Sequence, residues 1–177
     1  AFGFDQVKET IAAEFGRPLH EVFLFMDETP FASASIGQVH RASVTGEERL
    51  AVKIQRPGIR KTIEADLEII LHLAGIMERN IQEMAFYRPV KIVEEFAKTL
   101  EKELDYTIEA ANMERMAAQF LYDRTIHIPR VYPAESSERV LTMEFIDGIK
   151  ASDIDAIDRA GLDRKRITRR GADFIMK

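Results

Sequence analysis

The chain has 177 residues, of which 46% are hydrophobic and 31% charged, and its formal net charge is −5. These values are typical of a folded domain, or of part of a larger one, and exclude a disordered chain. The acidic balance argues against non-specific binding to nucleic acid, so we expect no nucleic-acid partner. The absence of cysteine excludes disulfides, thiolate metal sites and cysteine nucleophiles.

No stretch of the sequence is apolar enough to cross a membrane. The longest apolar run, from Ile69 to Met77, is interrupted by His72 and falls well short of the roughly 20 residues that a spanning helix needs. The first residues lack the basic and apolar regions of a signal peptide. We therefore expect a cytoplasmic location. Because the chain starts at Ala1 and ends inside a helical pattern, we interpret both ends as cut from a longer protein.

The first part of the chain predicts two short helices and then a β-hairpin. Val7, Ile11 and Phe15 recur every four residues after Asp5, which suits a helix cap, and Pro18 suits the first turn of a second helix. Residues 35–43 and 49–55 predict two strands joined by a turn at 45–47. In the second strand the side chains alternate, so residues 50, 52 and 54 face one side and residues 51, 53 and 55 the other.

Long helices and a second hairpin are expected in the rest of the chain. Apolar residues at helical spacing predict one helix around 63–77 and another that runs without a break from 89 to 111. Strands are expected at 127–132 and 139–146, joined by a polar turn. A helical tail begins near residue 152, and we interpret its basic run at 164–170 as a solvated face, with contact to anionic lipid as the alternative. This order predicts an α+β fold in which helices pack on a small antiparallel sheet.

The first segment with chemical meaning is the strand that contains Ala51 and Lys53. Both side chains lie on one face, so the lysine can reach nucleotide phosphates while the alanine leaves room for a base, as in the third strand of protein kinases. The alternative is a solvent-exposed lysine, because an alanine two residues before a lysine is a common pattern.

A run of small residues precedes the lysine strand by one hairpin, where a kinase has its Gly-rich phosphate loop. Small side chains let backbone N–H groups approach phosphate, although alanine restricts the backbone more than glycine does. The alternative is a turn of small residues that leads into a strand. The run comprises Ala32, Ser33, Ala34, Ser35, Ile36 and Gly37.

An acidic helical segment follows with Glu103, Asp105 and Glu109. Asp105 and Glu109 are four residues apart and are expected to share a helix face, whereas Glu103 need not share their role. A solvated acidic face is the commoner meaning of such a segment.

A later apolar strand ends in a polar, glycine-containing break. Met143, Glu144, Phe145 and Ile146 end the predicted strand, directly before the break at Asp147. The segment suits a hinge whose backbone binds the edge of an adenine. Taken alone, it is only the end of a strand.

These four segments occur in the chain order of a protein-kinase N-terminal lobe. Residues 31–40, 51–58, 103–112 and 141–148 resemble the UbiB family of atypical kinases, which is associated with the biosynthesis of ubiquinone and other isoprenoid lipids. The most specific part is the sequence S-I-G-Q-V-H at residues 35–40, and the resemblance covers nearly the whole chain. It implies a kinase-like N-terminal lobe at 1–150, with long inserted helices, and the start of a C-terminal lobe at 151–177.

The resemblance also implies roles for single residues. Lys53 would contact phosphate and Glu109 would pair with it, both as catalytic residues, while Glu103 and Asp105 would form the family's E-x-D motif. Residues 32–37 would form an alanine-rich loop over ATP or ADP. The base would contact Ala51, the gatekeeper position Met143, and the hinge residues Glu144, Phe145 and Ile146.

The implied function is that of an ATP- or ADP-binding lobe of an atypical kinase or ATPase that supports ubiquinone or isoprenoid-lipid biosynthesis. Family parts expected outside the segment are a K-x-G-Q helix before Ala1 and, after Lys177, a catalytic loop and a metal-binding motif. We therefore expect no metal site in this chain, Mg²⁺ only in the longer protein, and no phosphoryl transfer by the segment alone.

The nucleotide is the first partner that the resemblance implies. Lipid-biosynthesis proteins or a membrane surface, to which the longer protein would be peripheral, are the others. The alternative class is a non-catalytic, pseudokinase-type interaction domain that binds a protein partner or a membrane surface.

Overall fold

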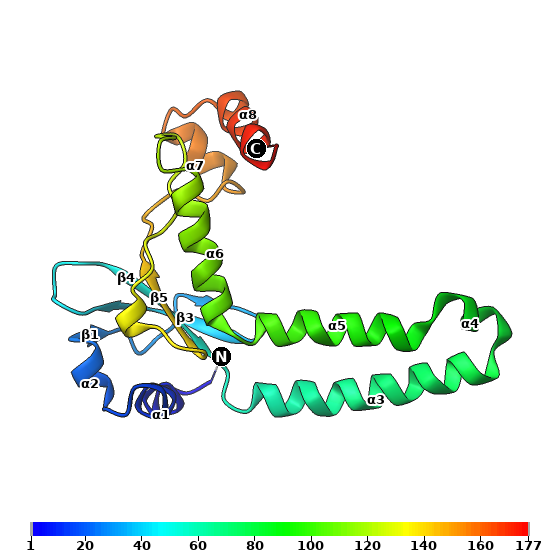
Figure 1. Cartoon of the computed structure of the whole chain (residues 1–177). Coiled ribbons are helices and arrows are strands. Elements are labelled where there is room, and N and C mark those ends of the chain that lie inside the picture. Colours follow the sequence, from blue (N-terminus) through cyan, green and yellow to red (C-terminus); the bar gives the residue numbers. More distant parts are fainter. Residues whose placement is uncertain (1, 177) are drawn as a thin grey trace.

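The computed structural model describes residues 2–176 and contains a five-stranded antiparallel sheet. Its main path has the order β1-β3-β4-β5, and β2 pairs with β3 at the side of this path. Helices lie against both faces of the sheet (Figure 1). The predicted α+β fold with a small antiparallel sheet is confirmed. The strands are β1 (Phe25–Met26), β2 (Ala32–Ser33), β3 (Gly37–Ser43), β4 (Leu50–Gln55) and β5 (Val140–Glu144).

One face of the sheet, called the outer face here, is covered by α1 (Phe4–Phe15) and α2 (Leu19–Val22). Leu50, Val52 and Ile54 alternate along β4 and are fully buried in this core, as the strand pattern predicts. Each such side chain stabilises the fold by about 1.5–3 kcal/mol. The prediction that Asp5 caps α1 is wrong. Gly3 occupies the cap position, and Asp5 lies within the first turn, where it pairs with Lys8 at 3.1 Å.

Two buried polar residues of β3 attach neighbouring segments to the outer face. Gln38 exchanges hydrogen bonds with the backbone of Phe2, and its Nε2 atom also lies 3.0 Å from His40 Nε2. The Nδ1 atom of His40 lies 2.7 Å from the carbonyl oxygen of Asp27, so Nδ1 must carry the proton and Nε2 must accept. The glutamine and histidine of the S-I-G-Q-V-H segment therefore have a structural role on the face opposite Lys53.

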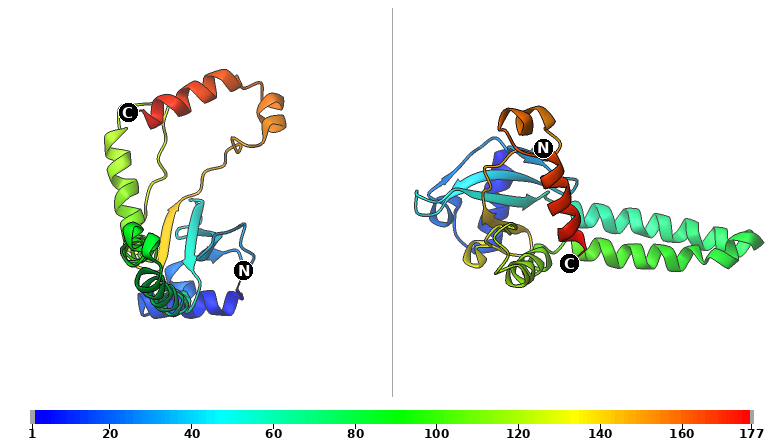
Figure 2. Two further views of the ribbon diagram at one scale, coloured as in Figure 1. Left: turned by 90° about the vertical axis from the view of Figure 1, so that its right-hand side faces the viewer. Right: turned by 90° about the horizontal axis from the view of Figure 1, so that it is seen from above.

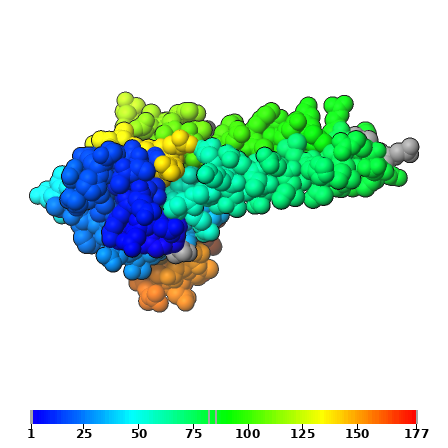
Figure 3. All heavy atoms as spheres, turned by 90° about the horizontal axis from the view of Figure 1, so that it is seen from below, coloured from blue at the N-terminus to red at the C-terminus, as the bar shows by residue number. Residues whose placement is uncertain are grey.

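After β4 the chain forms a helical arm of α3 (Ile59–Asn80), α4 (Gln82–Tyr87) and α5 (Pro89–Glu103). The two long helices run side by side and project away from the sheet (Figures 1 and 3). Pro89 begins α5, because the missing N–H of proline is harmless in a first helical turn. Ala74 is the buried residue of α3, and α5 has none. The contact between α3 and α5, called the seam of the arm here, therefore buries few side chains and does not form a hydrophobic core.

The helix that the sequence predicts from 89 to 111 is broken, so this prediction is wrong. It ends at Glu103, and α6 (Tyr106–Gln119) then turns away from the arm (Figure 2). Gln55 donates from Nε2 to the carbonyl oxygen of Leu104 at 2.8 Å, which holds the break against the sheet. Asp105 is extended and caps α6, so it does not share a helix face with Glu109.

The segment after α6 differs from the prediction as well. Residues 127–132 form no strand. They run beside β5 through one isolated bridge, Val131 to Met143, and two backbone hydrogen bonds. Pro129 lies within this stretch and Pro133 follows it directly, and both lack the N–H group that a continuous ladder needs.

The tail contains two helices, α7 (Ile154–Arg159) and α8 (Arg164–Ile175), separated at Gly161, whose φ is 67°. Phe174 of α8 contacts Phe120 at the end of α6, with ring centroids 5.1 Å apart. Between residues 2 and 176, no helix combines the length and apolar character that crossing a membrane requires. The division of the chain at residue 150 stays a prediction.

Candidate functional site

Strand β4 presents Ala51 and Lys53 on the inner face of the sheet, opposite the core of α1 and α2. Residues that lie directly opposite each other in an antiparallel sheet share a face. Lys53 lies opposite Leu141 on one side and opposite Val39 on the other, and Ala32 lies beyond Val39. Ala51 lies opposite Met143 in the next row. The sheet therefore brings Ala32, Ala51, Lys53 and Met143 to one face, as the pattern of the lysine strand requires.

Helix α6 packs on this face and supplies the partner of the lysine. Lys53 Nζ donates to Glu109 Oε2 at 2.7 Å, across 56 residues of sequence. The lysine side chain is 19% exposed and that of the glutamate 41%. A pair this open to solvent contributes about 1 kcal/mol or less to stability. Its main effect is to hold the ammonium group at one position on the inner face.

The two E-x-D residues lie beside this pair. Glu103 ends α5 and Asp105 caps α6, and both line a pocket of about 520 Å³ together with Lys53 and Glu109. The pocket carries the charges of two lysines, Lys53 and Lys102, and of three carboxylates. The rest of the lining consists of Thr99, Lys102, Ile108, Asn112, Met113 and Met116. Over residues 2–176, no group of three or more His, Asp or Glu side chains is placed to hold a metal ion.

The run of small residues forms the tip of the hairpin between β2 and β3. The N–H of Ala34 donates to the carbonyl oxygen of Gly37 at 2.8 Å, which closes the β2–β3 turn (residues 34–36). Ala32, Ser33 and Ser35 are exposed and free to approach a ligand. Ile36 instead packs towards Tyr106, and Gly37 is buried. The roles predicted for residues 32–37 stay predictions.

The site predicted for the nucleotide base begins in β5. Met143 packs against the buried cluster of Tyr106, Val131 and Leu141. Glu144 accepts hydrogen bonds from His127 Nε2 at 2.8 Å and from the N–H of Arg130 at 3.2 Å. Burial by itself would raise the pKa of Glu144, but these hydrogen bonds outweigh it and lower the pKa. The carboxylate of Glu144 is therefore tied to the segment beside β5, and its backbone N–H donates to the carbonyl oxygen of Arg130 at 2.8 Å.

An aromatic and cationic cluster surrounds the predicted hinge. Phe145 lies edge-to-face with Phe31 at 5.4 Å between ring centroids, and the guanidinium of Arg41 lies 4.9 Å from the Phe145 ring. The N–H of Phe145 donates to the carbonyl oxygen of Arg49 at 2.9 Å, so it is not free in this structure. Ile146 is about half exposed. Neither the hinge nor the β2–β3 turn lines the pocket of Lys53.

The sequence-based reasoning missed Arg41 and Tyr106. Arg41 lies opposite Ala51, so the alternation of β3 was a signal that it faces the site. Tyr106 is fully buried beneath Lys53, whose Nζ lies 4.6 Å from the centre of the ring. The sequence did not indicate that Tyr106 lies beneath Lys53, because the predicted continuous helix from 89 to 111 would direct its side chain differently.

The geometry defines a class of protein. A small antiparallel sheet carries a lysine on one strand, and that lysine pairs with a glutamate from a helix packed on the sheet, as in the N-terminal lobe of a kinase-like domain. The model of the ABC1 atypical kinase-like domain matches residues 1–177. The chain therefore belongs to the ABC1 atypical kinase-like family.

Named relatives agree with this membership. The chain is 35% identical over 176 residues to Protein ACTIVITY OF BC1 COMPLEX KINASE 7, chloroplastic, from Arabidopsis thaliana, covering 99% of this chain and 25% of that protein. It is 38% identical over 169 residues to a probable protein kinase UbiB from Aliivibrio fischeri, covering 95% of this chain and 31% of that protein. The resemblance to the UbiB family is thus confirmed. The chain spans between a quarter and a third of the length of these relatives.

A solved structure has the same fold. Rv3197 from Mycobacterium tuberculosis, determined as a complex with erythromycin, matches with a TM-score of 0.73 and 30% sequence identity. The match covers 86% of this chain and 38% of that one.

Proposed function

We propose that this chain is the ATP- or ADP-binding lobe of an atypical kinase or ATPase that supports the biosynthesis of ubiquinone or a related isoprenoid lipid. The observation that carries the proposal is the contact of 2.7 Å between Lys53 and Glu109 on the inner face of the sheet. In protein kinases a strand lysine held by a helix glutamate contacts the nucleotide phosphates. The relatives named UbiB support the assignment to this pathway.

In this proposal Lys53 neutralises the charge of the phosphates, and Glu109 orients the lysine side chain. The small exposed side chains of Ala32, Ser33 and Ser35 let this part of the hairpin approach the phosphates, and Ala51 and Met143 lie against the base. Glu103 and Asp105 lie at the phosphate end of the site, in the pocket that Lys53 shares. Residues elsewhere in the longer protein hold the Mg²⁺ that accompanies ATP and complete the transfer, so the segment alone binds nucleotide without turning it over.

Thermal unfolding of the full-length protein tests nucleotide binding. Wild type, Lys53→Ala and the control Lys91→Ala, which removes an exposed lysine of the arm, are compared with ATP, ADP or no nucleotide, with and without Mg²⁺. A ligand at a hundred times its dissociation constant adds about 2.7 kcal/mol to stability. We expect nucleotide to raise the Tm of wild type and Lys91→Ala but not that of Lys53→Ala. An equal rise in Lys53→Ala would contradict the assigned role.

One observation favours a second function, a non-catalytic interaction domain. Ile69, Leu73, Ile92 and Phe96 of the arm are each more than half exposed, and exposed apolar patches often mark binding surfaces. Residues 59–103 contain seven Lys and Arg against nine Asp and Glu, and this acidic balance favours a protein partner over an anionic membrane. If nucleotide leaves the Tm of wild type unchanged, the interaction function replaces the nucleotide function.

A further inference from the structure

Tyr106 lies where the start of α6, the side chain of Lys53 and the β2–β3 turn meet. It is the first residue of α6, and its N–H donates to the carbonyl oxygen of Glu138 at 2.9 Å, which fixes the start of the helix beside the sheet. Its ring lies beneath Lys53, with the ammonium nitrogen 4.6 Å from the ring centre. Its hydroxyl oxygen lies 2.8 Å from the position that a Cβ atom on Gly37 would occupy. The hydroxyl thus reaches the base of the β2–β3 turn.

This hydroxyl has no hydrogen-bond partner, although the side chain is only 1% exposed. Among the described residues it is the one buried side-chain nitrogen or oxygen in that situation. Folded proteins seldom leave such a group unpaired, and the exceptions need an explanation such as a ligand or a catalytic role. Burial, and then the charges of Glu109 and Glu103, raise the pKa of Tyr106, so the group stays a neutral donor at physiological pH.

The neighbours of the hydroxyl indicate which acceptor it lacks. An anion bound to Lys53 would stand beside the Tyr106 ring, because the ammonium group already lies against it. Gly37 has no side chain to separate the turn from the hydroxyl. Gly37 ends the turn, where its carbonyl oxygen accepts the hydrogen bond from Ala34, and it also pairs with Gln55 at the start of the ladder between β3 and β4.

We propose that Tyr106 is a further phosphate-binding residue, whose hydroxyl donates to a phosphate oxygen of a nucleoside diphosphate or triphosphate held by Lys53. This inference rests on the proposed nucleotide function and names a second donor in the same site. The hydroxyl gains its missing acceptor only when the ligand is bound. In the free protein it is a buried donor without a partner.

The proposal predicts opposite effects of removing the hydroxyl in the free and in the ADP-bound protein. Wild type, Tyr106→Phe and Tyr132→Phe are prepared in the full-length protein, and the affinity for ADP is measured by calorimetry beside the Tm without ligand. Tyr106→Phe keeps the ring under Lys53 and removes the unpaired hydroxyl, so the Tm without ligand should be unchanged or higher. ADP should bind about ten- to a hundredfold more weakly, which corresponds to the loss of a hydrogen bond to a charged group. Tyr132→Phe, at a half-buried tyrosine that takes no part in the site, should change neither value.

The outcomes separate this inference from the function on which it rests. If Tyr106→Phe binds ADP as tightly as wild type, the inference is wrong while the nucleotide function stands. If affinity and Tm both fall, Tyr106 is a structural residue and the inference is again wrong. If wild type itself binds no ADP, the proposed function fails, and the inference fails with it.

Discussion

At Gly37 the backbone of β3 passes close to β4 and to Tyr106. A Cβ atom there would lie 2.5 Å from the carbonyl oxygen of Ile54 and 2.8 Å from the Tyr106 hydroxyl, and the first of these is backbone that cannot move alone. We expect Gly37→Ala to lower the free energy of unfolding by about 1–3 kcal/mol. Gly171→Ala is the control, because α8 leaves open space at that position and alanine favours a helix. Denaturant unfolding measures both, and an unchanged Gly37→Ala would refute the close packing.

His40 makes stability depend on pH. Burial lowers its pKa below the ordinary value of about 6.5, and this effect outweighs the hydrogen bond to the carbonyl oxygen of Asp27, which raises the pKa. A protonated His40 would turn a second N–H towards the amide nitrogen of Gln38. The folded state thus binds its proton less readily than the unfolded state. The contribution of His40 is complete above about pH 6.5 and falls as the pH drops through the folded pKa.

Two variants isolate this effect. We expect the free energy of unfolding of wild type to decline between pH 7 and pH 5, and His40→Asn to lose that part of the slope. His20→Asn, which replaces an exposed histidine, should keep it. Equal slopes in wild type and His40→Asn would show that another group is responsible.

At the scale of the element, the start of α6 depends on one side chain. Asp105 Oδ1 accepts a hydrogen bond from the N–H of Thr107 at 2.9 Å and another from the Thr107 hydroxyl at 2.6 Å. We expect Asp105→Ala to lower the free energy of unfolding by about 1 kcal/mol, as for other helix caps, and Asp105→Asn to lower it much less. Denaturant unfolding of the two variants checks this.

The same pair of variants separates the cap from the E-x-D motif. Asparagine keeps the cap but removes the carboxylate charge, so any loss of nucleotide affinity or turnover in Asp105→Asn belongs to the chemistry of the site. If alanine and asparagine are equally destabilising, the cap is not what holds α6.

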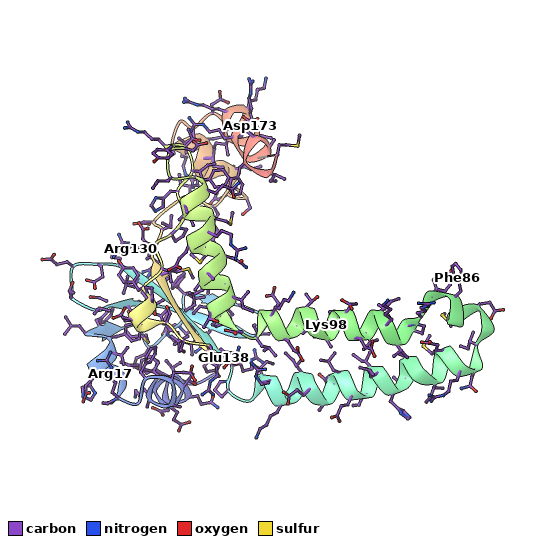
Figure 4. The ribbon with its side chains drawn as sticks, in the orientation of Figure 1. Arg17, Phe86, Lys98, Arg130, Glu138 and Asp173 are labelled. Carbon is purple, nitrogen blue, oxygen red and sulfur yellow. The ribbon has the colours of Figure 1, made fainter. Side chains whose placement is uncertain are left out.

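At the scale of the whole molecule, the arm and the sheet differ in how firmly they are held. The sheet is buried between two layers of side chains, whereas the seam of the arm buries Ala74, and Phe86 lies at the far end (Figure 4). Segments with few buried contacts open most easily. We expect backbone amides of α3 and α5 to exchange with solvent faster than those of β3 and β4, as measured by hydrogen exchange with mass spectrometry.

A substitution in the seam should act on the arm alone. Ala74→Asp places a charge in the contact between α3 and α5, so exchange should rise in the arm and stay unchanged in the sheet. Ala65→Asp introduces the same charge at an exposed position of α3 and should have little effect. If Ala74→Asp also accelerated exchange in β4, the two parts would form one cooperative unit.

The contact between Lys53 and Glu109 could be predicted from the sequence, whereas the residues that surround this pair could not. Lys53 and Glu109 were expected as partners from the family resemblance, and the structure places them in contact. Tyr106 and Arg41 escaped notice because a residue's neighbours across the sheet depend on register and on where α6 begins. The roles of all these residues in nucleotide binding stay predictions.

The sequence alone determined what depends on nearest neighbours along the chain. Alternation placed Leu50, Val52 and Ile54 on the buried face of β4, and helical spacing located α1 and most of the arm, because side-chain direction repeats with the backbone period. The prolines at 129 and 133 were also present in the sequence, and they leave too few donors for a ladder at 127–132. Only the tertiary structure decided the break at Leu104, because apolar spacing continues there and the helix is stopped by hydrogen bonds from Gln55 and to Glu138.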